Sequence, residues 1–257
     1  MASDLDVSTA DGICRITFTR ASAYNALSEE MATGLVAQLR AAVSDDEVRV
    51  VVITGSGEAF SAGADLHGDN PVEHFDEATM EGAATIVRSI VELDKPVVAA
   101  VNGIAAGIGA SICFAADLAV CAESAAFVLA FSHVGLMVDG GSSLTVAAAA
   151  GRSRAMRMAL LGEPMSAREA HGAGLVSHVV PDEELSALVD SVARRLAAGP
   201  PLAYAATKRA INAATIGELE DALAREERGQ LALFRTDDAA EGMRAFVQKR
   251  RPRFVGR

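Results

Sequence analysis

An aspartate and two glycine-rich turns are the parts of this sequence whose residue types and spacing suit catalysis. Asp139 stands in GLMVDGG, inside an otherwise apolar stretch. One turn, SGEAFSAGADL, contains Gly63, and the other, NGIAAGIGAS, contains Gly107 and opens a predicted helix. Helix N-termini present unpaired N–H groups. Two such turns side by side bind an oxyanion, and a nearby carboxylate moves a proton.

Each glycine-rich turn, taken alone, is also explained by tight packing of the backbone. Neither turn contains GxGxxG or GxxxxGK[ST], so the sequence predicts neither a dinucleotide site nor a P-loop. The GxSxG elbow of serine hydrolases does not occur either. The chemistry therefore depends on whether the fold brings the two turns together.

The elements that position these turns alternate between strands and helices. Strands are predicted over residues 12–19, 48–55 and 96–103, and helices over 28–43 and 78–92. Ser28 is a suitable N-cap for the first of these helices. The alternation predicts an α/β fold with parallel strands covered by helices.

The pattern becomes almost entirely helical after Gly162. Helices are expected over residues 166–174, 182–199, 201–214 and 217–234, and a short strand over 175–180. We predict a core of residues 1–195 and a helical C-terminal region of residues 196–257 that serves oligomerisation.

Composition excludes several classes of function. The net charge of −11 disfavours a general nucleic-acid binder. No apolar run reaches the roughly 20 residues of a membrane span, and the acidic start does not resemble a secretory signal, so we expect a cytoplasmic protein. The three cysteines and five histidines show no ligand spacing, so no metal site is predicted.

The two turns together, in this order and separation, resemble the crotonase (enoyl-CoA hydratase/isomerase) superfamily. The resemblance continues through AADLAVCAESAAF, ALLGEPMSAREAHGAGLVSHVV and EGMRAFVQKRRPRF, and so covers nearly the whole chain. It implies a crotonase-like ββα spiral core with a helical C-terminal region, assembled as a homotrimer or hexamer. It also implies an acyl-CoA thioester substrate, with coenzyme A as part of the substrate and no further cofactor.

The resemblance assigns residues to the binding of the thioester. The N–H groups of Ala64 and Ile108 correspond to the family's oxyanion hole. A further set corresponds to positions that contact coenzyme A: Ala23, Ala26, Ala62, Asp65, Leu66, Phe246 and Lys249. The alternative for Lys249 is an exposed helix end.

The acid and base residues depart from the usual family pattern. Typical hydratases of the family carry two glutamates where this chain has Ser111 and Phe131. Asp139 corresponds instead to the catalytic aspartate of the branch with enoyl-CoA isomerases and the phenylacetate-pathway ring-epoxide isomerase. This implies a shift of a 3-enoyl to a 2-enoyl thioester. The alternatives are a helix cap for Asp139, a hydratase with an atypical site, and a non-catalytic acyl-CoA-binding subunit.

Overall fold

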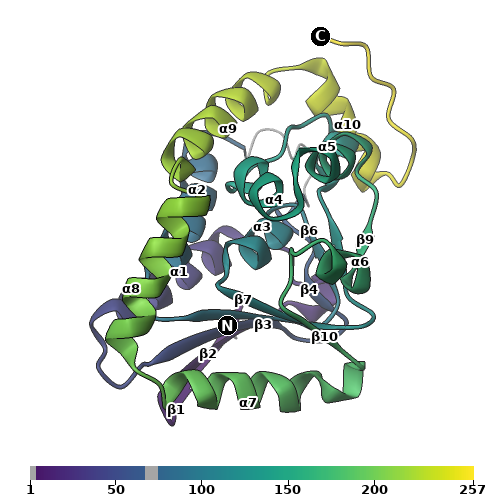
Figure 1. Cartoon of the computed structure of the whole chain (residues 1–257). Coiled ribbons are helices and arrows are strands. Elements are labelled where there is room, and N and C mark those ends of the chain that lie inside the picture. Colours follow the sequence, from purple (N-terminus) through teal and green to yellow (C-terminus); the bar gives the residue numbers. More distant parts are fainter. Residues whose placement is uncertain (1–3, 67–74) are drawn as a thin grey trace.

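A six-stranded mixed sheet crosses the lower part of the molecule (Figure 1). The structure is a computed structural model that describes residues 4–66 and 75–257. The strand order is β1 (Leu5–Ala10), β2 (Ile13–Phe18), β3 (Val50–Gly55), β5 (Val97–Val101), β7 (Leu118–Ala122) and β10 (His178–Val180). β1 runs antiparallel to β2, and every other neighbouring pair is parallel. The predicted parallel α/β core is therefore confirmed.

A second sheet of short strands stands beside the first. Its order is β4 (Ala59–Ser61), β6 (Ile104–Ala106), β8 (Ala126–Val128) and β9 (Met165–Ser166). The chain passes from β3 to β4, from β5 to β6 and from β7 to β8, and a helix follows each of the first two pairs. This repeated passage is the ββα spiral that the resemblance implied.

Helices cover both faces of the large sheet and build the C-terminal region (Figure 1). They are α1 (Glu29–Ser44), α2 (Glu77–Glu92), α3 (Ile108–Ala115), α4 (Ser142–Ala150), α5 (Arg152–Leu161), α6 (Ala167–Gly172), α7 (Leu185–Ala197), α8 (Pro201–Thr215), α9 (Leu219–Leu233) and α10 (Asp237–Val247). Short 3-10 turns are η1 (Ala21–Ala23), η3 (Ala130–Val134) and η4 (Asp182–Glu184). The predicted cap of α1 is confirmed, because the N–H of Met31 donates to Ser28 Oγ at 3.2 Å.

Side chains of the central strands point alternately to the two faces of the sheet and so form two layers of the core. Val51 and Ile53 of β3 pack on the side of α1, α2 and α3, whereas Val50 and Val52 pack on the side of α7. Successive side chains of a strand point to opposite faces, so a continuous apolar run fits a sheet buried on both sides. α7 ends at Ala197, and the boundary expected at residue 195 falls inside it.

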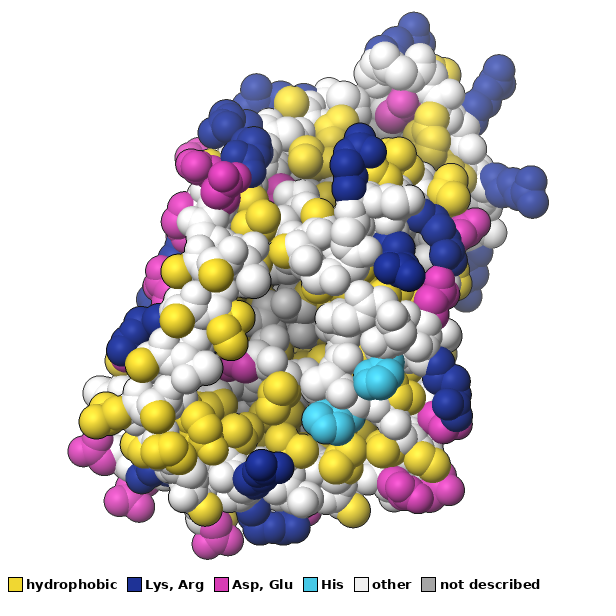
Figure 2. Space-filling view, viewed as in Figure 1, with side chains coloured by type: hydrophobic (Ala, Val, Ile, Leu, Met, Phe, Trp, Pro, Cys, Tyr) yellow, Lys and Arg dark blue, Asp and Glu magenta, His cyan; other side chains and the backbone are white. Residues whose placement is uncertain are grey.

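The last three helices lie against the core through separate contacts. α8 lies at the end of α2, α9 packs on α2 and α4, and α10 packs on η3. Figure 2 shows hydrophobic side chains gathered at the surface over α8 and its junction with α7. Leu202 and Ile211 of α8 are 85% and 56% exposed. Within residues 4–66 and 75–257, no helix has the length and apolarity needed to cross a membrane.

Candidate active site

The two glycine-rich turns meet because β4 and β6 are adjacent parallel strands. Gly63 and Gly107 follow these strands, both with positive φ, at +95° and +51°. A Cβ on Gly63 would stand 2.8 Å from the carbonyl oxygen of Ala106. Only glycine permits this approach of one backbone to the other. The fold thus brings the predicted oxyanion residues Ala64 and Ile108 into one place.

The amide groups of these two residues are available to a ligand. In the described part of the chain, neither the N–H of Ala64 nor that of Ile108 has a hydrogen-bond acceptor. Ile108 is the first residue of α3, where backbone N–H groups have no partner within the helix and the helix dipole is positive. The pair therefore has the chemistry of an oxyanion hole.

Asp139 lies beside the first turn of α3. A Cβ on its neighbour Gly140 would stand 2.5 Å from Ile108 Cδ1 and 2.8 Å from Ser111 Cβ. The hydroxyl of Ser111 donates to the main-chain oxygen of Asp139 at 2.9 Å. These contacts place the predicted acid next to Ile108, although the two residues are distant in the sequence.

The two carboxyl oxygens of Asp139 have different surroundings. The residue is 8% exposed, and its Oδ2 accepts a hydrogen bond from Gln230 Nε2 at 2.8 Å. Its Oδ1 is buried and has no hydrogen-bond partner in the described chain. Burial raises the pKa of Asp139 to about 7; the hydrogen bond from Gln230 opposes the rise and the negative charge of Glu226 adds to it. A carboxyl group with such a pKa exchanges protons near neutral pH.

The alternative that Asp139 caps α4 with its side chain is wrong. The N-cap position is Gly141, and Glu226 of α9 satisfies the start of this helix. Glu226 accepts from the N–H of Gly141 at 2.7 Å and from the N–H of Ser143 at 2.9 Å. The carboxyl group of Asp139 is therefore not needed for the cap.

The two positions that lack glutamate are filled by buried residues of another kind. Ser111 is fully buried, and its hydroxyl donates to the main-chain oxygen of Asp139. Phe131 is 8% exposed, and a Cβ on Gly107 would stand 3.9 Å from its Cζ. An aromatic ring thus packs beside the oxyanion turn, where the usual hydratases carry a carboxylate.

Five of the residues predicted to contact coenzyme A lie in two adjacent strips of backbone, residues 23–27 and 62–66. Three hydrogen bonds join the strips, from Ala62 N to Tyr24 O at 2.9 Å, from Leu27 N to Gly63 O at 2.7 Å and from Asp65 N to Leu27 O at 3.1 Å. The predicted residues in them are Ala23, Ala26, Ala62, Asp65 and Leu66.

Arg20 holds these strips together, a role that no motif in the sequence indicates. Its Nη1 donates to Ala26 O at 2.6 Å and its Nη2 to Asp65 Oδ2 at 2.7 Å. The carboxylate of Asp65 therefore pairs with an arginine inside the same chain. A backbone surface fixed in this way suits an extended ligand that runs beside Ala64.

Phe246 and Lys249 lie elsewhere, at the end of α10. Phe246 is 61% exposed, and Lys249 is exposed with φ of +52°. Within the described residues, no hydrogen bond or ion pair joins them to the strips 23–27 and 62–66. The structure of one chain therefore does not bring these two predicted residues to the others.

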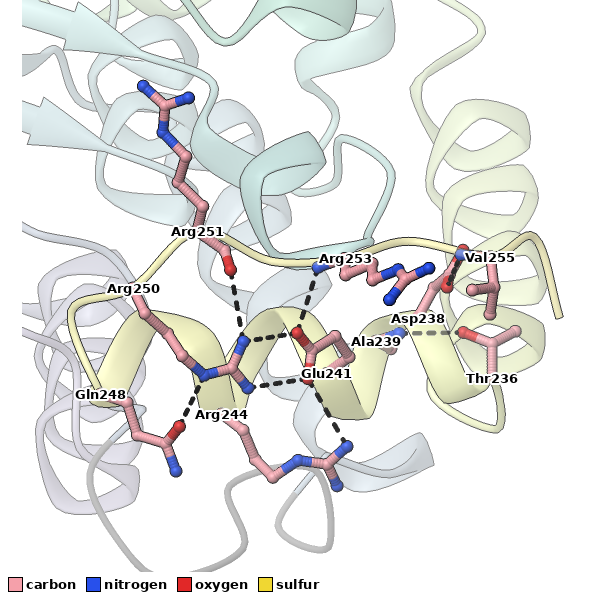
Figure 3. Close-up of polar contacts among 10 residues, drawn as sticks. All are labelled: Thr236, Asp238, Ala239, Glu241, Arg244, Gln248, Arg250, Arg251, Arg253 and Val255. Atoms are coloured by element: carbon pink, nitrogen blue, oxygen red, sulfur yellow. Dashed lines mark hydrogen bonds and ion pairs between the residues drawn. The ribbon is translucent and has the colours of Figure 1, made fainter.

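The C-terminal tail beyond Lys249 folds back along α10 (Figure 3). Glu241 binds the guanidinium of Arg250 through both oxygens, at 2.5 and 2.8 Å, and accepts from the N–H of Arg253 at 3.1 Å. The hydrogen bond from Arg250 is the main cause that lowers the pKa of Glu241 to about 2. Part of the basic cluster thus anchors the tail, whereas the side chain of Arg251 points away from α10.

Comparison with known proteins identifies this arrangement of spiral core and paired turns. The sequence model of the family described as enoyl-CoA hydratase/isomerase matches residues 8–257. A crystal structure of an enoyl-CoA hydratase from Mycobacterium avium subsp. paratuberculosis K-10 superposes with a TM-score of 0.93 at 45% identity, covering 99% of this chain and 100% of that one. The fold is thus that of the crotonases. The chain belongs to the enoyl-CoA hydratase/isomerase family.

Curated relatives of this chain include both isomerases and hydratases. A 1,2-epoxyphenylacetyl-CoA isomerase of Escherichia coli K12 is 38% identical, with 96% of each chain covered. A probable enoyl-CoA hydratase of Rhodobacter capsulatus is 41% identical, again with 96% of each chain covered. Sequence identity to these relatives therefore does not decide between isomerisation and hydration. The residues around Asp139 bear on that choice.

Proposed function

We propose that this enzyme moves a double bond of an acyl-CoA thioester from the 3,4 to the 2,3 position, with Asp139 as the acid and base. The observation that supports the proposal is the buried carboxyl group of Asp139, on a segment that contacts the first turn of α3. Among the described residues, the N–H groups of Ala64 and Ile108 have no hydrogen-bond acceptor. The family relationship supports an acyl-CoA substrate, and the 1,2-epoxyphenylacetyl-CoA isomerase among the relatives supports isomerisation. A strip of backbone beside Ala64 offers a path for the coenzyme A portion.

The proposed reaction uses each part of the site. The N–H groups of Ala64 and Ile108 hold the thioester oxygen, which becomes negative when a proton leaves C2. Asp139 accepts this proton and returns it to C4 of the resulting dienolate. A double-bond shift is redox-neutral, so it requires no redox cofactor, and coenzyme A enters as part of the substrate.

The residues at positions 111 and 131 support isomerisation over hydration. Addition of water to a 2-enoyl thioester requires groups that orient the water and exchange its proton with the α-carbon. Phe131 offers neither function, and the hydroxyl of Ser111 is already bound to the main chain of Asp139. One carboxylate remains, which is sufficient for a shift of a double bond.

Replacement of Asp139 by asparagine tests the proposal. Asparagine keeps the size of the side chain and an oxygen that accepts from Gln230, but it cannot take a proton from C2. We expect isomerisation of a 3-enoyl-CoA to fall about a hundredfold or more, with binding of the thioester retained. Formation of the conjugated product is followed by ultraviolet absorbance. The control is Asp46→Asn, because Asp46 is exposed in the loop after α1.

Three outcomes would contradict the proposal. An Asp139→Asn enzyme with normal turnover would show that another group moves the proton. A wild-type enzyme that hydrates 2-enoyl-CoA but leaves 3-enoyl-CoA unchanged would be a hydratase with an atypical site. Binding of a panel of thioesters without turnover of any of them would instead indicate a non-catalytic acyl-CoA-binding subunit.

A further inference from the structure

α9 presents two buried polar side chains to the segment that carries Asp139. Glu226 and Gln230 are 1% and 0% exposed, in a helix whose outer face is rich in charged residues. They are four positions apart, so they lie on the same face of the helix one turn from each other. A buried carboxylate and a buried amide are unfavourable unless their hydrogen bonds are made, and both side chains make theirs with the segment 137–143.

Gln230 fixes the position of the Asp139 carboxyl group. Its Nε2 donates to Asp139 Oδ2 at 2.8 Å, and its Oε1 accepts from the N–H of Met137 at 3.2 Å. The amide thus bridges the side chain of Asp139 and the backbone two residues before it. Oδ1, the other oxygen, has no partner in the described residues.

Glu226 holds the same segment on the other side of Asp139. Its two oxygens accept from the N–H groups of Gly141 and Ser143, at 2.7 and 2.9 Å. Together, the two α9 side chains bind every second residue from position 137 to position 143. The orientation of the acid is therefore determined by a helix that is distant from it in sequence.

Resting on the isomerase proposed above, we propose that Gln230 and Glu226 are positioning residues that assign the two oxygens of Asp139 to different tasks. Gln230 occupies Oδ2 throughout the reaction, and Oδ1 exchanges the proton with the substrate. Glu226 holds the turn at residues 139–143 so that Asp139 keeps its place beside the first turn of α3.

The proton balance of the reaction agrees with this division. In the first step the C2–H bond breaks, the proton passes to Oδ1, and the electron pair moves to the thioester oxygen. In the second step the O–H bond at Oδ1 breaks, the C4–H bond forms, and the dienolate becomes the conjugated thioester. The N–H of Gln230 stays on Oδ2 in both steps, so the carboxyl group need not rotate between them.

The two positioning residues act on the ionisation of Asp139 in opposite directions. Burial is the main cause of the raised pKa; the hydrogen bond from Gln230 lowers the pKa and the charge of Glu226 raises it. The charge of Glu226 is close enough to Asp139 to raise its pKa. Removal of Gln230 therefore shifts the pKa of Asp139 upward, and removal of the charge of Glu226 shifts it downward.

The test is the dependence of kcat on pH for Gln230→Met and Glu226→Gln, measured with a 3-enoyl-CoA. Because the working base is ionised Asp139, the wild-type rate rises with pH through a midpoint near 7. We expect the midpoint to move to higher pH in Gln230→Met and to lower pH in Glu226→Gln. At neutral pH, kcat of Gln230→Met falls about tenfold to a hundredfold, while KM stays close to the wild-type value.

The control is Glu220→Gln, which removes an acid from the exposed face of α9 and an ion pair with Arg88. We expect its midpoint and kcat to equal those of the wild type. Midpoints that stay unchanged in both test variants, with only the melting temperature lowered, would assign Gln230 and Glu226 to stability alone and overturn the inference. Normal isomerisation by Asp139→Asn would contradict the proposed function itself. Unchanged midpoints in Gln230→Met and Glu226→Gln, with an inactive Asp139→Asn, would contradict only the positioning roles.

A second measurement uses the wild-type enzyme and does not depend on variants that fold. A crystal structure with a saturated acyl-CoA, which binds without reacting, shows which oxygen faces the acyl chain. We expect C2 to lie nearest Oδ1, with Gln230 still bound to Oδ2. A complex in which Oδ2 faces C2, or in which Gln230 has left the carboxyl group, would overturn the division of tasks.

Discussion

At the scale of single residues, the surroundings of Asp139 favour its neutral form. The side chain is buried, and the nearby charge is the like charge of Glu226. Desolvation and like charge both disfavour ionisation. The same environment that suits proton transfer therefore destabilises the folded enzyme whenever Asp139 is ionised.

Asp139→Asn is expected to stabilise the fold at alkaline pH. The folded-state pKa of about 7 lies above the ordinary value of 3.8, so the unfolded chain ionises first as pH rises. The free energy of unfolding then falls between these values, by on the order of 4 kcal/mol for a shift of about three units. Asparagine does not ionise, so the variant does not lose this free energy of unfolding. We expect the variant to exceed the wild type by a few kcal/mol at pH 8 and by little near pH 4.

Urea unfolding of both proteins across this pH range measures the difference. The difference in the free energy of unfolding between the variant and the wild type should increase with pH and level off above the folded-state pKa of Asp139. A variant that is less stable than the wild type at pH 8 would show that the carboxyl group is stabilised by contacts that asparagine cannot make.

At the scale of elements, one ion pair with little exposure joins α8 to the core. Lys208 Nζ donates to Asp117 Oδ2 at 2.8 Å and to the main-chain oxygen of Ile90 at the same distance. The side chains of Lys208 and Asp117 are 8% and 22% exposed. Burial raises the pKa of Asp117 and lowers that of Lys208, although each charge opposes the effect on the other.

Lys208→Ala should therefore destabilise the protein strongly. It leaves the carboxylate of Asp117 buried without its cation, a change that typically costs about 3–5 kcal/mol. The matched control is Arg209→Ala in the next position of α8. Arg209 pairs with Asp94, but both side chains are more than half exposed, so the expected loss is below about 1 kcal/mol. Chemical denaturation compares the two variants, and equal losses would contradict the argument.

Elements with a clear local pattern of caps and apolar spacing were predicted from the sequence. Short strands that depend on pairing with neighbouring strands were missed. The cap at Ser28 and the apolar spacing of Met31, Leu35, Leu39 and Val43 indicated α1. The first three side chains are buried, whereas Val43 is 66% exposed. β4, β6 and β8 have three residues each, too few to show a period. β1 was missed because five of its six residues are exposed, as in an edge strand.

The site was predictable only where a motif marks it. Family motifs pointed to Ala64, Ile108 and Asp139, and the fold brings these three together. Gln230 and Glu226 stand in GELEDALAREERGQLALF, where one acid and one amide among many polar residues show nothing unusual. Only the tertiary structure shows that these two side chains face inward, and this holds for Arg20 as well.

At the scale of the whole molecule, the C-terminal region leaves apolar surface exposed. Leu202 and Ile211 of α8 are more than half exposed, and Phe246 at the end of α10 is 61% exposed. Apolar side chains gathered on a surface typically mark an interface, as the gathering over α8 in Figure 2 illustrates. We propose that this region joins copies of the chain, which would also allow Phe246 and Lys249 to approach the strips 23–27 and 62–66 of a neighbour.

Light scattering should therefore give a mass three or six times that of one chain at micromolar concentration. The double variant Leu202→Glu with Ile211→Glu should lower this mass, because it places charges in the expected interface. Val43→Glu is the control, since Val43 is 66% exposed but lies on α1. A wild-type monomer would contradict the expectation, as would a double variant with unchanged mass.

The attachment of Asp139 to α9 has a consequence for how the enzyme adapts to a change in acidity. Asp139 and Gln230 are 91 positions apart, so a mutation in α9 alters the ionisation of the acid without replacing any residue of the segment 137–143. Selection for activity in a more acidic medium should therefore favour replacements at position 226, which keep the base ionised at lower pH. Selection for an alkaline medium should favour replacements at position 230, because a base is most effective when its pKa lies near the working pH. In both cases the aspartate, the amide donors and the specificity for the acyl chain would be inherited unchanged.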